Sequence, residues 1–477
     1  MVFSSYRFLF AFLPIVLLGY YLLSSARTNT AQRIYLLLAS FVFYGFSNPK
    51  YLFLLFASIV INYLCASGIQ SLPQNHQPFR KLLLITGLLF NILLIGYYKY
   101  YDYFVLNINR AIGTHLSKKS IILPLGISFF TFQQLSLLVS VYKQEESVDS
   151  FLDYSLFITF FPQLVAGPIV LYNEMVPQIR QQSTRRFNID HFIAGIYIFS
   201  IGIFKKVVIA DTFSIFATDG FALTEFSLAS TWAASLCYTM QIYFDFSGYS
   251  DMATGLARMF NIYLPVNFRC PYQSSSISEF WRRWHITLGR VLSRHVYIPL
   301  GGNRQGQGRT CLNLLLTFIV SGFWHGAGNK FILWGLFHGL FIIAERLSEK
   351  VFYRIPKLMR TIYTFLTVNF LWVMFRAPSV KLAFSFYRAM FDFSHIGLDK
   401  LSWMARHSSF SFWNPLDYIC ICGSILLCIL FVFKFDRGPA AFESFKPTCR
   451  NLLLSILLFC ISLTFLAEEQ IFIYFNF

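Results

Sequence analysis

The chain has 477 residues, of which 56% are hydrophobic, 19% aromatic and 13% charged. In soluble domains about a quarter of all residues are charged, so this composition excludes an ordinary soluble protein. The formal net charge of +17 at pH 7 would suit nucleic-acid binding. In so apolar a chain it instead indicates Lys and Arg gathered beside anionic lipid. We therefore expect membrane lipid, and no nucleic acid, among its partners.

Apolar residues occur in runs of roughly 15–20 residues separated by charged connectors. In lipid only helices and closed barrels satisfy their own backbone hydrogen bonds, and a barrel strand would alternate apolar and polar residues, which these runs do not. The sequence thus predicts an all-α polytopic membrane protein forming one membrane domain over 1–477. The runs lie near 8–23, 34–46, 51–66, 82–98, 121–139, 152–170, 192–210, 229–244, 312–325, 331–344, 362–375, 417–433 and 451–467.

The Lys and Arg bias of the connectors predicts orientation. The connector 267–311 carries seven Arg and one Glu, so we expect it in the cytoplasm. Segment 211–228 has three acidic and no basic residues, and the tail after Leu466 has Glu468 and Glu469. Both segments are therefore expected outside, as is the N-terminus, where residues 8–23 are interpreted as a first anchor and not as a cleaved signal.

Two runs conflict with this orientation. If 121–139 and 152–170 both crossed the membrane, the basic connector 171–191 would lie outside. One of the two is therefore expected to be re-entrant or broken, which is tolerated at membrane depth only inside protein or beside a cavity. The conflict indicates a cavity near the middle of the protein. Helix-breaking residues in these runs are Pro124, Gly126, Pro162, Gly167 and Pro168.

Asp245 lies at the end of the apolar run 229–244, within 243–251, which also contains Asp251. A buried carboxylate needs a partner. Asp245 is expected either to orient a histidine or to form a structural ion pair, and the sequence leaves both interpretations open.

Residues 276–294 are predicted to form one amphipathic helix, because Ser276 and Glu279 have capping-box spacing. On a helical wheel one face carries Trp281, Trp284, His285, Leu288 and Leu292. The other face carries Arg283, Arg290 and Arg294, with Arg282 to the side.

The arginines of this helix are expected to anchor lipid headgroups or to bind the phosphates of a donor such as a coenzyme A thioester. His285 lies on the apolar face, so it is either part of a substrate path or a packed, hydrogen-bonded residue.

His325 lies at membrane depth in the predicted hairpin 312–344. A histidine there is a functional-site hypothesis by default, although a neutral histidine joining two helices is the alternative. Ser321 lies four residues earlier and could share the helix face of His325, but packing by a small residue is the favoured interpretation.

Several other chemistries find no motif in the sequence. The nine cysteines include no pair at metal-ligand spacing, and His325 and His338 have no carboxylate nearby, so neither a metal site nor a disulfide framework is expected. A Gly-x-Ser-x-Gly elbow and a nucleotide loop are also missing. A buried general base remains, which suits direct acyl transfer between two bound substrates.

Nine segments in the same order and spacing resemble the membrane-bound O-acyltransferase (MBOAT) family, most closely its bacterial alginate O-acetylation type. They include Trp281-Arg282-Arg283-Trp284-His285 and Trp324-His325-Gly326. The complete set is 123–129, 161–169, 204–211, 243–252, 264–268, 280–285, 297–302, 324–326 and 375–377.

The resemblance implies a ring of about 10–12 transmembrane helices, with re-entrant and amphipathic helices, around a central tunnel. It implies that His325 is the catalytic histidine and His285 its partner. Supporting or substrate-path positions would be Asp245, Trp324, Ser321, Trp284 and Asn267, and donor or headgroup contacts Arg282 and Arg283.

By the same resemblance we expect an O-acyltransferase of the bacterial inner membrane. It would take an acetyl group from acetyl-CoA, with no tightly bound cofactor, for O-acetylation of an exopolysaccharide. Expected partners are an exported acetyltransferase- or esterase-like protein and the polysaccharide synthesis machinery. The alternatives are a D-alanyl or other acyltransferase, a transporter or flippase of envelope polysaccharide, and a non-catalytic scaffold.

Overall fold

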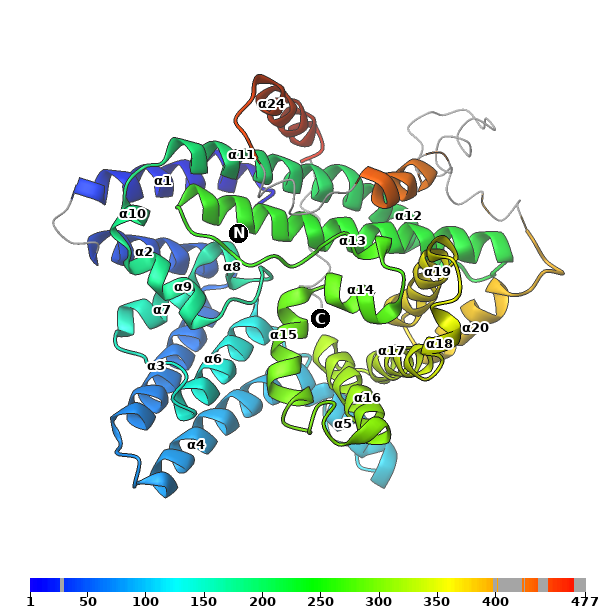
Figure 1. Ribbon diagram of the computed structural model, residues 1–477, viewed down its shortest axis with the longest axis horizontal. Coiled ribbons are helices and arrows are strands. Elements are labelled where there is room, and N and C mark those ends of the chain that lie inside the picture. The colour runs from blue at the N-terminus through cyan, green and yellow to red at the C-terminus, as the bar shows by residue number, and fades with distance from the viewer. Residues whose placement is uncertain (26–29, 398–400, 402–422, 424, 436–444, 467–477) are drawn as a thin grey trace. The chain divides into compact units, whose positions relative to one another are not determined.

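The computed structural model describes residues 1–25, 30–397, 401, 423, 425–435 and 445–466, and within these residues every regular element is helical (Figure 1). The all-α prediction is confirmed. Four helical stretches are long and apolar enough to cross a membrane. They are Pro49–Ser71, Gln77–Ile112, Ile189–Ala222 and Lys357–Arg376, beside the shorter apolar helices Phe8–Leu22, Ile127–Tyr142 and Cys449–Thr464.

Contacts group the residues into two compact units, which are described separately. Of the described residues, the first unit contains those within 1–203, 249–265 and 445–466, and the second those within 204–248 and 266–435. The single membrane domain stays a prediction. The C-terminal tail with Glu468 and Glu469, and residues 417–422 and 424 of the run 417–433, lie outside the described residues.

The first unit is built from short and long helices in chain order. Residues 249–259 belong to the last part of α13 (Leu228–Met259). The other elements are η1 (Phe8–Phe12), α1 (Leu13–Leu22), η2 (Leu23–Ser25), α2 (Thr30–Gly45), α3 (Pro49–Ser71), α4 (Gln77–Ile95), η3 (Gly96–Tyr100), α5 (Tyr101–Ile112), α6 (Ile127–Tyr142), α7 (Phe151–Thr159), α8 (Phe161–Leu164), α9 (Tyr172–Arg180), α10 (Gln182–Arg185), α11 (Ile189–Ile203) and α24 (Cys449–Thr464).

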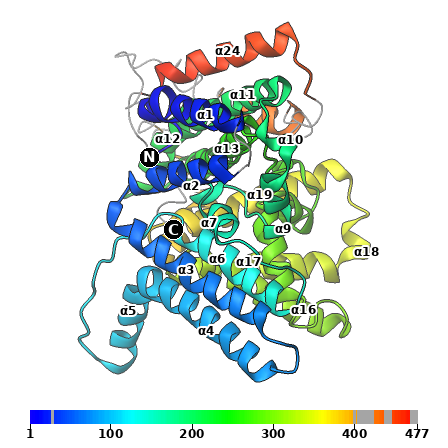
Figure 2. The ribbon, with the colours of Figure 1, turned by 90° about the vertical axis from the view of Figure 1, so that its left-hand side faces the viewer.

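Helices α3, α4 and α6 lie side by side in this unit (Figure 2). Buried amides join them, because Asn91 Nδ2 donates to Asn62 Oδ1 at 2.6 Å and Ser58 Oγ donates to Gln134 Oε1 at 2.9 Å. Such polar side chains connect helices in lipid, where apolar contact alone provides little driving force.

The break expected in 121–139 or 152–170 lies in the second segment. Helix α7 has nine residues and is about 14 Å long, too short for a hydrocarbon core of about 30 Å. After the four-residue α8, the chain through 165–170 is buried and irregular. Its neighbourhood supplies polar partners, since the backbone N–H of Phe161 donates to Ser40 Oγ at 3.2 Å.

The second unit begins with a π-helical turn and ends, among its described helices, with η8. It includes the first part of α13. The other elements are η4 (Phe204–Ala210), α12 (Asp211–Ala222), η5 (Pro271–Gln273), α14 (Ile277–Arg283), α15 (Ile286–Leu292), η6 (Ser293–Tyr297), α16 (Gly306–His325), α17 (Asn329–Leu347), α18 (Glu349–Phe352), α19 (Lys357–Arg376), α20 (Val380–Met390) and η8 (Phe431–Phe435).

The predicted hairpin 312–344 corresponds to α16 and α17, which approach very closely. A Cβ atom at Gly322 would overlap the carbonyl oxygen of Phe331, and one at Gly335 would overlap that of Phe318. Only glycine fits at both positions, so the small residues set the distance between the two helix backbones.

We expect Gly335→Val to destabilise the protein by about 1–3 kcal/mol or more, because the added carbons force α16 and α17 apart. The measurement is the thermal unfolding midpoint in detergent. Gly308→Ala is the matched control, since nothing lies within 4 Å of that position in α16 and alanine favours a helix. An equal loss in both variants would contradict the tight crossing.

Candidate functional site

The predicted helix over 276–294 is interrupted at Trp284 and His285. Helix α14 ends at Arg283, Trp284 is extended, and His285 has φ +46° and ψ +51° before α15 begins at Ile286. The single continuous helix was therefore wrong. The N-terminal cap is confirmed, since Ser276 Oγ accepts from the N–H of Glu279 at 3.0 Å, although the Glu279 carboxylate binds Ser275 and not Ser276.

The interruption is held by the segment that begins at Asn267. The N–H of Arg269 donates to the carbonyl of Arg283 at 2.9 Å, and the N–H of Ile286 donates to the carbonyl of Asn267 at 3.0 Å. Backbone groups released by breaking the helix are thus paired within the protein. This pairing outweighs the helical preference of the local sequence.

Asn267 also determines the tautomer of His285. Its Oδ1 accepts from the N–H of Thr287 at 3.4 Å and from Thr287 Oγ1 at 3.0 Å, which identifies this atom as the oxygen. His285 Nδ1 lies 3.1 Å from the same oxygen and must therefore donate. The neutral ring then carries its lone pair on Nε2.

His285 is only 1% exposed, and burial lowers its pKa from 6.5 to about 3. Aromatic rings surround it, with the Phe246 ring 4.8 Å away edge-on. A buried imidazole avoids the charged form because charge is costly in a medium of low polarity. His285 is therefore a neutral hydrogen-bonding group over the usual pH range.

His325 is the last residue of α16 and is 1% exposed. Its ring lies within an aromatic cage, at centroid distances of 5.1 Å from Trp334 and 5.5 Å from Phe375, both nearly edge-on. These residues come from α17 and α19. The tight α16–α17 hairpin therefore brings His325 against helices that the sequence alone does not place beside it.

Trp324 lies close to both histidines. Its ring centroid is 4.9 Å from that of His325 and 6.0 Å from that of His285. The structure thus brings His325 and His285 to one indole, and the side chain of Asn267 holds His285.

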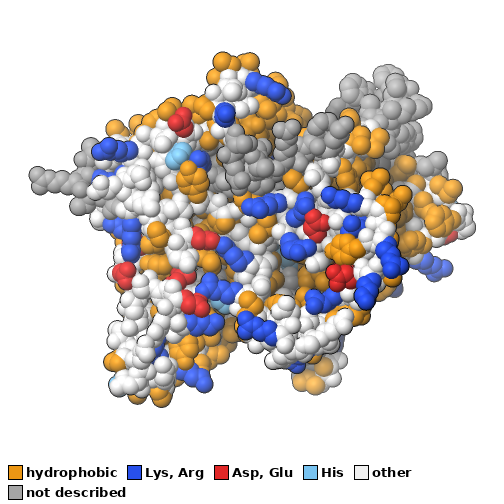
Figure 3. All heavy atoms as spheres, in the orientation of Figure 1, with side chains coloured by type: hydrophobic (Ala, Val, Ile, Leu, Met, Phe, Trp, Pro, Cys, Tyr) orange, Lys and Arg blue, Asp and Glu red, His pale blue; other side chains and the backbone are white. Residues whose placement is uncertain are grey.

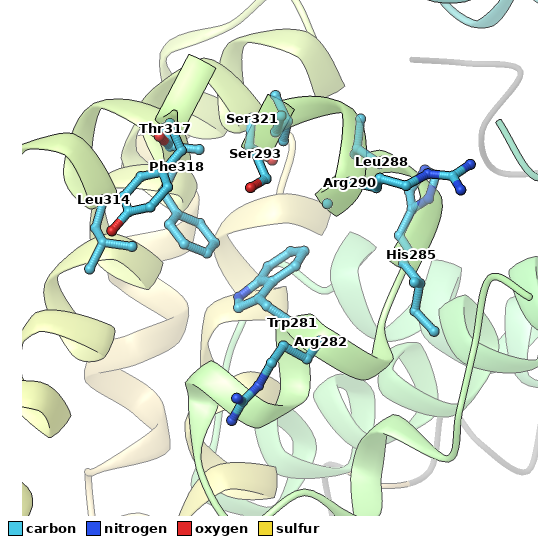
Figure 4. Close-up of a pocket in the computed structure, with 14 residues that line it drawn as sticks. Trp281, Arg282, His285, Leu288, Arg290, Ser293, Leu314, Thr317, Phe318 and Ser321 are labelled. Carbon is cyan, nitrogen blue, oxygen red and sulfur yellow. The ribbon is translucent and has the colours of Figure 1, made fainter. Parts of the chain in front are cut away.

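A cavity of about 400 Å³ opens beside His285 (Figure 4). Its walls are α14, α15 and the middle of α16, and they are mostly apolar. Ser321 lies on this wall, one helical turn before His325 in α16, and its role stays a prediction. The lining residues are Trp281, Arg282, His285, Ile286, Leu288, Gly289, Arg290, Leu292, Ser293, Tyr297, Leu314, Thr317, Phe318 and Ser321.

The arginines divide differently from the helical-wheel prediction. Arg282 and Arg290 line the cavity, whereas Arg283 pairs with Glu279 at 2.6 Å. The wheel placed Arg290 opposite His285, and this was wrong because α15 turns after the break. Many further Lys and Arg side chains gather on the face over α14 to α18 (Figure 3).

Trp284 and Asp245 do not contact the cavity. Trp284 is packed among aromatic rings, including Phe268 at 5.1 Å and Trp372 at 5.1 Å. Asp245 is 2% exposed and its carboxylate lies 2.8 Å from Lys206 Nζ. Of the two interpretations for Asp245, the structure contains the ion pair.

The sequence did not predict Trp281, Trp334 or His338 as site residues. His338 was considered only as a metal ligand, and the described residues contain no cluster of three or more His, Cys, Asp or Glu side chains that could hold a metal. It is fully buried and its Nδ1 accepts from Trp281 Nε1 at 3.1 Å. The four-residue spacing of Trp334 and His338 in an apolar helix was the available signal.

The sequence is similar to those of several known proteins. The family described as MBOAT, membrane-bound O-acyltransferase family, matches residues 119–387. A peptidoglycan O-acetyltransferase of Helicobacter pylori is 40% identical over 100% of this chain and 98% of its own length. A probable alginate O-acetylase of Pseudomonas aeruginosa is 39% identical over 84% and 77%. A teichoic acid D-alanyltransferase of Bacillus subtilis is 28% identical over 50% and 62%.

We expect His285 to make the protein less stable in acid. The folded protein keeps His285 neutral until about pH 3, whereas the unfolded chain binds a proton below about pH 6.5. Stability should fall by up to about 1.4 kcal/mol per pH unit below 6.5. The wild-type unfolding midpoint should therefore fall more between pH 7 and 5 than that of His285→Gln, with exposed His76→Gln as control. Parallel pH dependences of wild type and His285→Gln would refute this.

We expect Lys206→Met to lower the free energy of unfolding by about 3–5 kcal/mol, because the substitution removes the ammonium group that pairs with the buried carboxylate of Asp245. The free energy of unfolding of the Lys206→Met/Asp245→Asn double variant should fall by less than the sum of the two single decreases. Chemical unfolding of all four proteins measures this coupling. Strictly additive losses would show that the pair contributes no interaction energy.

Proposed function

Because this chain belongs to the membrane-bound O-acyltransferase family, we propose that it transfers an acetyl group from a cytoplasmic thioester to a hydroxyl of a cell-envelope glycan. The chain is a membrane-bound acyltransferase. The acetyl group, its acetyl-CoA donor and the acceptor are our proposal.

One observation carries the proposed mechanism. His325 is buried against three aromatic rings, those of Trp324, Trp334 and Phe375, and the Trp324 ring also lies 6.0 Å from that of His285. Histidine is the side chain that most often serves as a general base. His325 is therefore the base in our proposal, and His285 is its partner in the substrate path.

The proposed reaction needs no enzyme nucleophile. His325 accepts the proton of the acceptor hydroxyl while the oxygen attacks the thioester carbonyl carbon. The tetrahedral intermediate then expels the thiolate as the carbon–sulfur bond breaks, and the thiolate takes the proton from His325. The ester and the free thiol are the products, and a general base of this kind contributes roughly 10²–10⁴-fold.

The cavity beside His285 supports binding of the donor. Its walls are apolar, which suits an acyl thioester, while Arg282 and Arg290 contribute positive charge. Guanidinium groups suit phosphate, so these two residues would contact the phosphates of coenzyme A. The exposed basic face over α14 to α18 would attract the same anion or anionic lipid (Figure 3).

Peptidoglycan is the first acceptor to test, because the relative named for it matches this chain along its whole length. An exopolysaccharide is the second candidate, since a relative named for alginate covers 84% of the chain at similar identity. Both acceptors lie outside the inner membrane. We therefore propose that an exported acetyltransferase- or esterase-like partner and the synthesis machinery of the glycan complete the system.

In cells that carry His325→Ala or His325→Gln, we expect the amount of glycan-bound acetyl ester to fall at least about 100-fold below that of wild type. The level of the protein in membranes should stay normal. Cells would be supplied with isotopically labelled acetate, and base-released acetate from purified peptidoglycan and exported polysaccharide would be measured by mass spectrometry. Thr310→Ala is the matched control, because Thr310 also lies in α16, donates its hydroxyl to the carbonyl of Gly306 within that helix and is outside the cavity lining.

The same experiment separates the rival functions. Unchanged ester in His325→Ala would refute a catalytic role for His325 and favour a scaffold. A transporter or flippase would be favoured by two results together. Wild type would form no glycan-bound ester, and His325→Ala would stop movement of a glycan across the membrane. Released D-alanine in place of acetate would identify the D-alanyl activity named for a more distant relative.

A further inference from the structure

Trp281 forms one wall of the cavity and is fixed from several sides. Its ring lies 5.3 Å from that of Phe318 and 5.5 Å from that of Trp334, both close to edge-on. Phe318 also lines the cavity, and the ring centroids of Trp334 and His325 lie 5.1 Å apart. Figure 4 shows the Trp281 indole projecting from α14 toward the Phe318 ring of α16. The indole therefore limits the cavity on the side of the aromatic cage.

His338 fixes the orientation of this indole. An indole N–H can only donate, so His338 Nδ1 must be the acceptor in the 3.1 Å hydrogen bond from Trp281 Nε1. The partner ring is fully buried in α17, 5.0 Å from the Trp281 ring. Rotation of Trp281 away from the cavity wall would leave a buried donor and acceptor without each other, which is costly in an apolar interior.

We propose that Trp281 is a specificity-determining residue that restricts the acyl donor to short chains, and that His338 is the positioning residue that holds it. This inference rests on the proposed function, because it assumes that the cavity receives the acyl end of the thioester. Removing the indole would extend the cavity toward His338 and Trp334, which lie directly behind it.

The chemistry of the remaining walls supports a limit on chain length. Leu288, Leu292, Leu314 and Phe318 would favour an apolar tail of any length. Selection for a short tail then depends on a rigid steric stop. Discrimination in an apolar pocket amounts to about 10–200-fold per methylene, so a displaced indole should change chain-length preference measurably.

The test uses membranes that contain the full chain and its glycan acceptor. Equal amounts of acetyl-CoA and hexanoyl-CoA are supplied together, and both base-released acids are measured by mass spectrometry. We expect the hexanoyl-to-acetyl ratio to rise at least about tenfold in Trp281→Leu. Because the ratio is internal to each sample, a lower amount of folded protein does not change it.

Two further variants test the role of His338. His338→Phe keeps an aromatic ring but removes the acceptor, so its ratio should rise in the same direction as that of Trp281→Leu. His338→Gln keeps an acceptor oxygen, so its ratio should return toward that of wild type. His338→Phe also provides the readout if Trp281→Leu does not fold.

Trp232→Leu is the matched control for loss of a tryptophan. Trp232 is half-buried in α13 and donates to the carbonyl of Met390 at 3.0 Å, outside the cavity lining. Its ratio should equal that of wild type. An unchanged ratio in Trp281→Leu, or an equal rise in Trp232→Leu, would overturn the inference. No acyl transfer from either thioester by wild type would instead refute the proposed function.

Discussion

The candidate site depends on the hydrogen bonds that one buried amide makes across the chain. Asn267 holds His285 through its side chain and holds the backbone of the helix interruption through its carbonyl. Each of these groups would otherwise lose its partner in an apolar interior, where an unmade hydrogen bond is expensive. Because this one side chain orients His285, it also fixes the wall of the cavity that follows in α15.

The buried charges and the two site histidines have different surroundings. The two described buried carboxylates with arginine or lysine partners, Asp153 and Asp245, pair with Arg33, Arg180 and Lys206. His285 and His325 instead lie among aromatic rings. Pairing makes buried charge tolerable, whereas burial lowers the pKa of His285 and keeps its ring neutral.

Close helix packing and specificity are connected in the second unit. Glycines at the α16–α17 crossing allow the two backbones to approach, and His338 and Trp334 of α17 contact Trp281 of α14. A larger residue at the crossing would shift both the cage around His325 and the cavity wall. The packing of these helices therefore also determines the geometry of the site, because close-packed interiors transmit small displacements.

Local patterns in the sequence determined the all-α membrane class, an interruption in either 121–139 or 152–170, the N-terminal cap of α14 and the family motifs around His285 and His325. These features depend on composition, spacing and neighbours along the chain. Tertiary structure alone decided that the helix breaks at Trp284, that Asp245 pairs with Lys206, and that Trp281 binds His338. Each of these outcomes joins residues distant in the sequence, and helical periodicity carries no information about such partners.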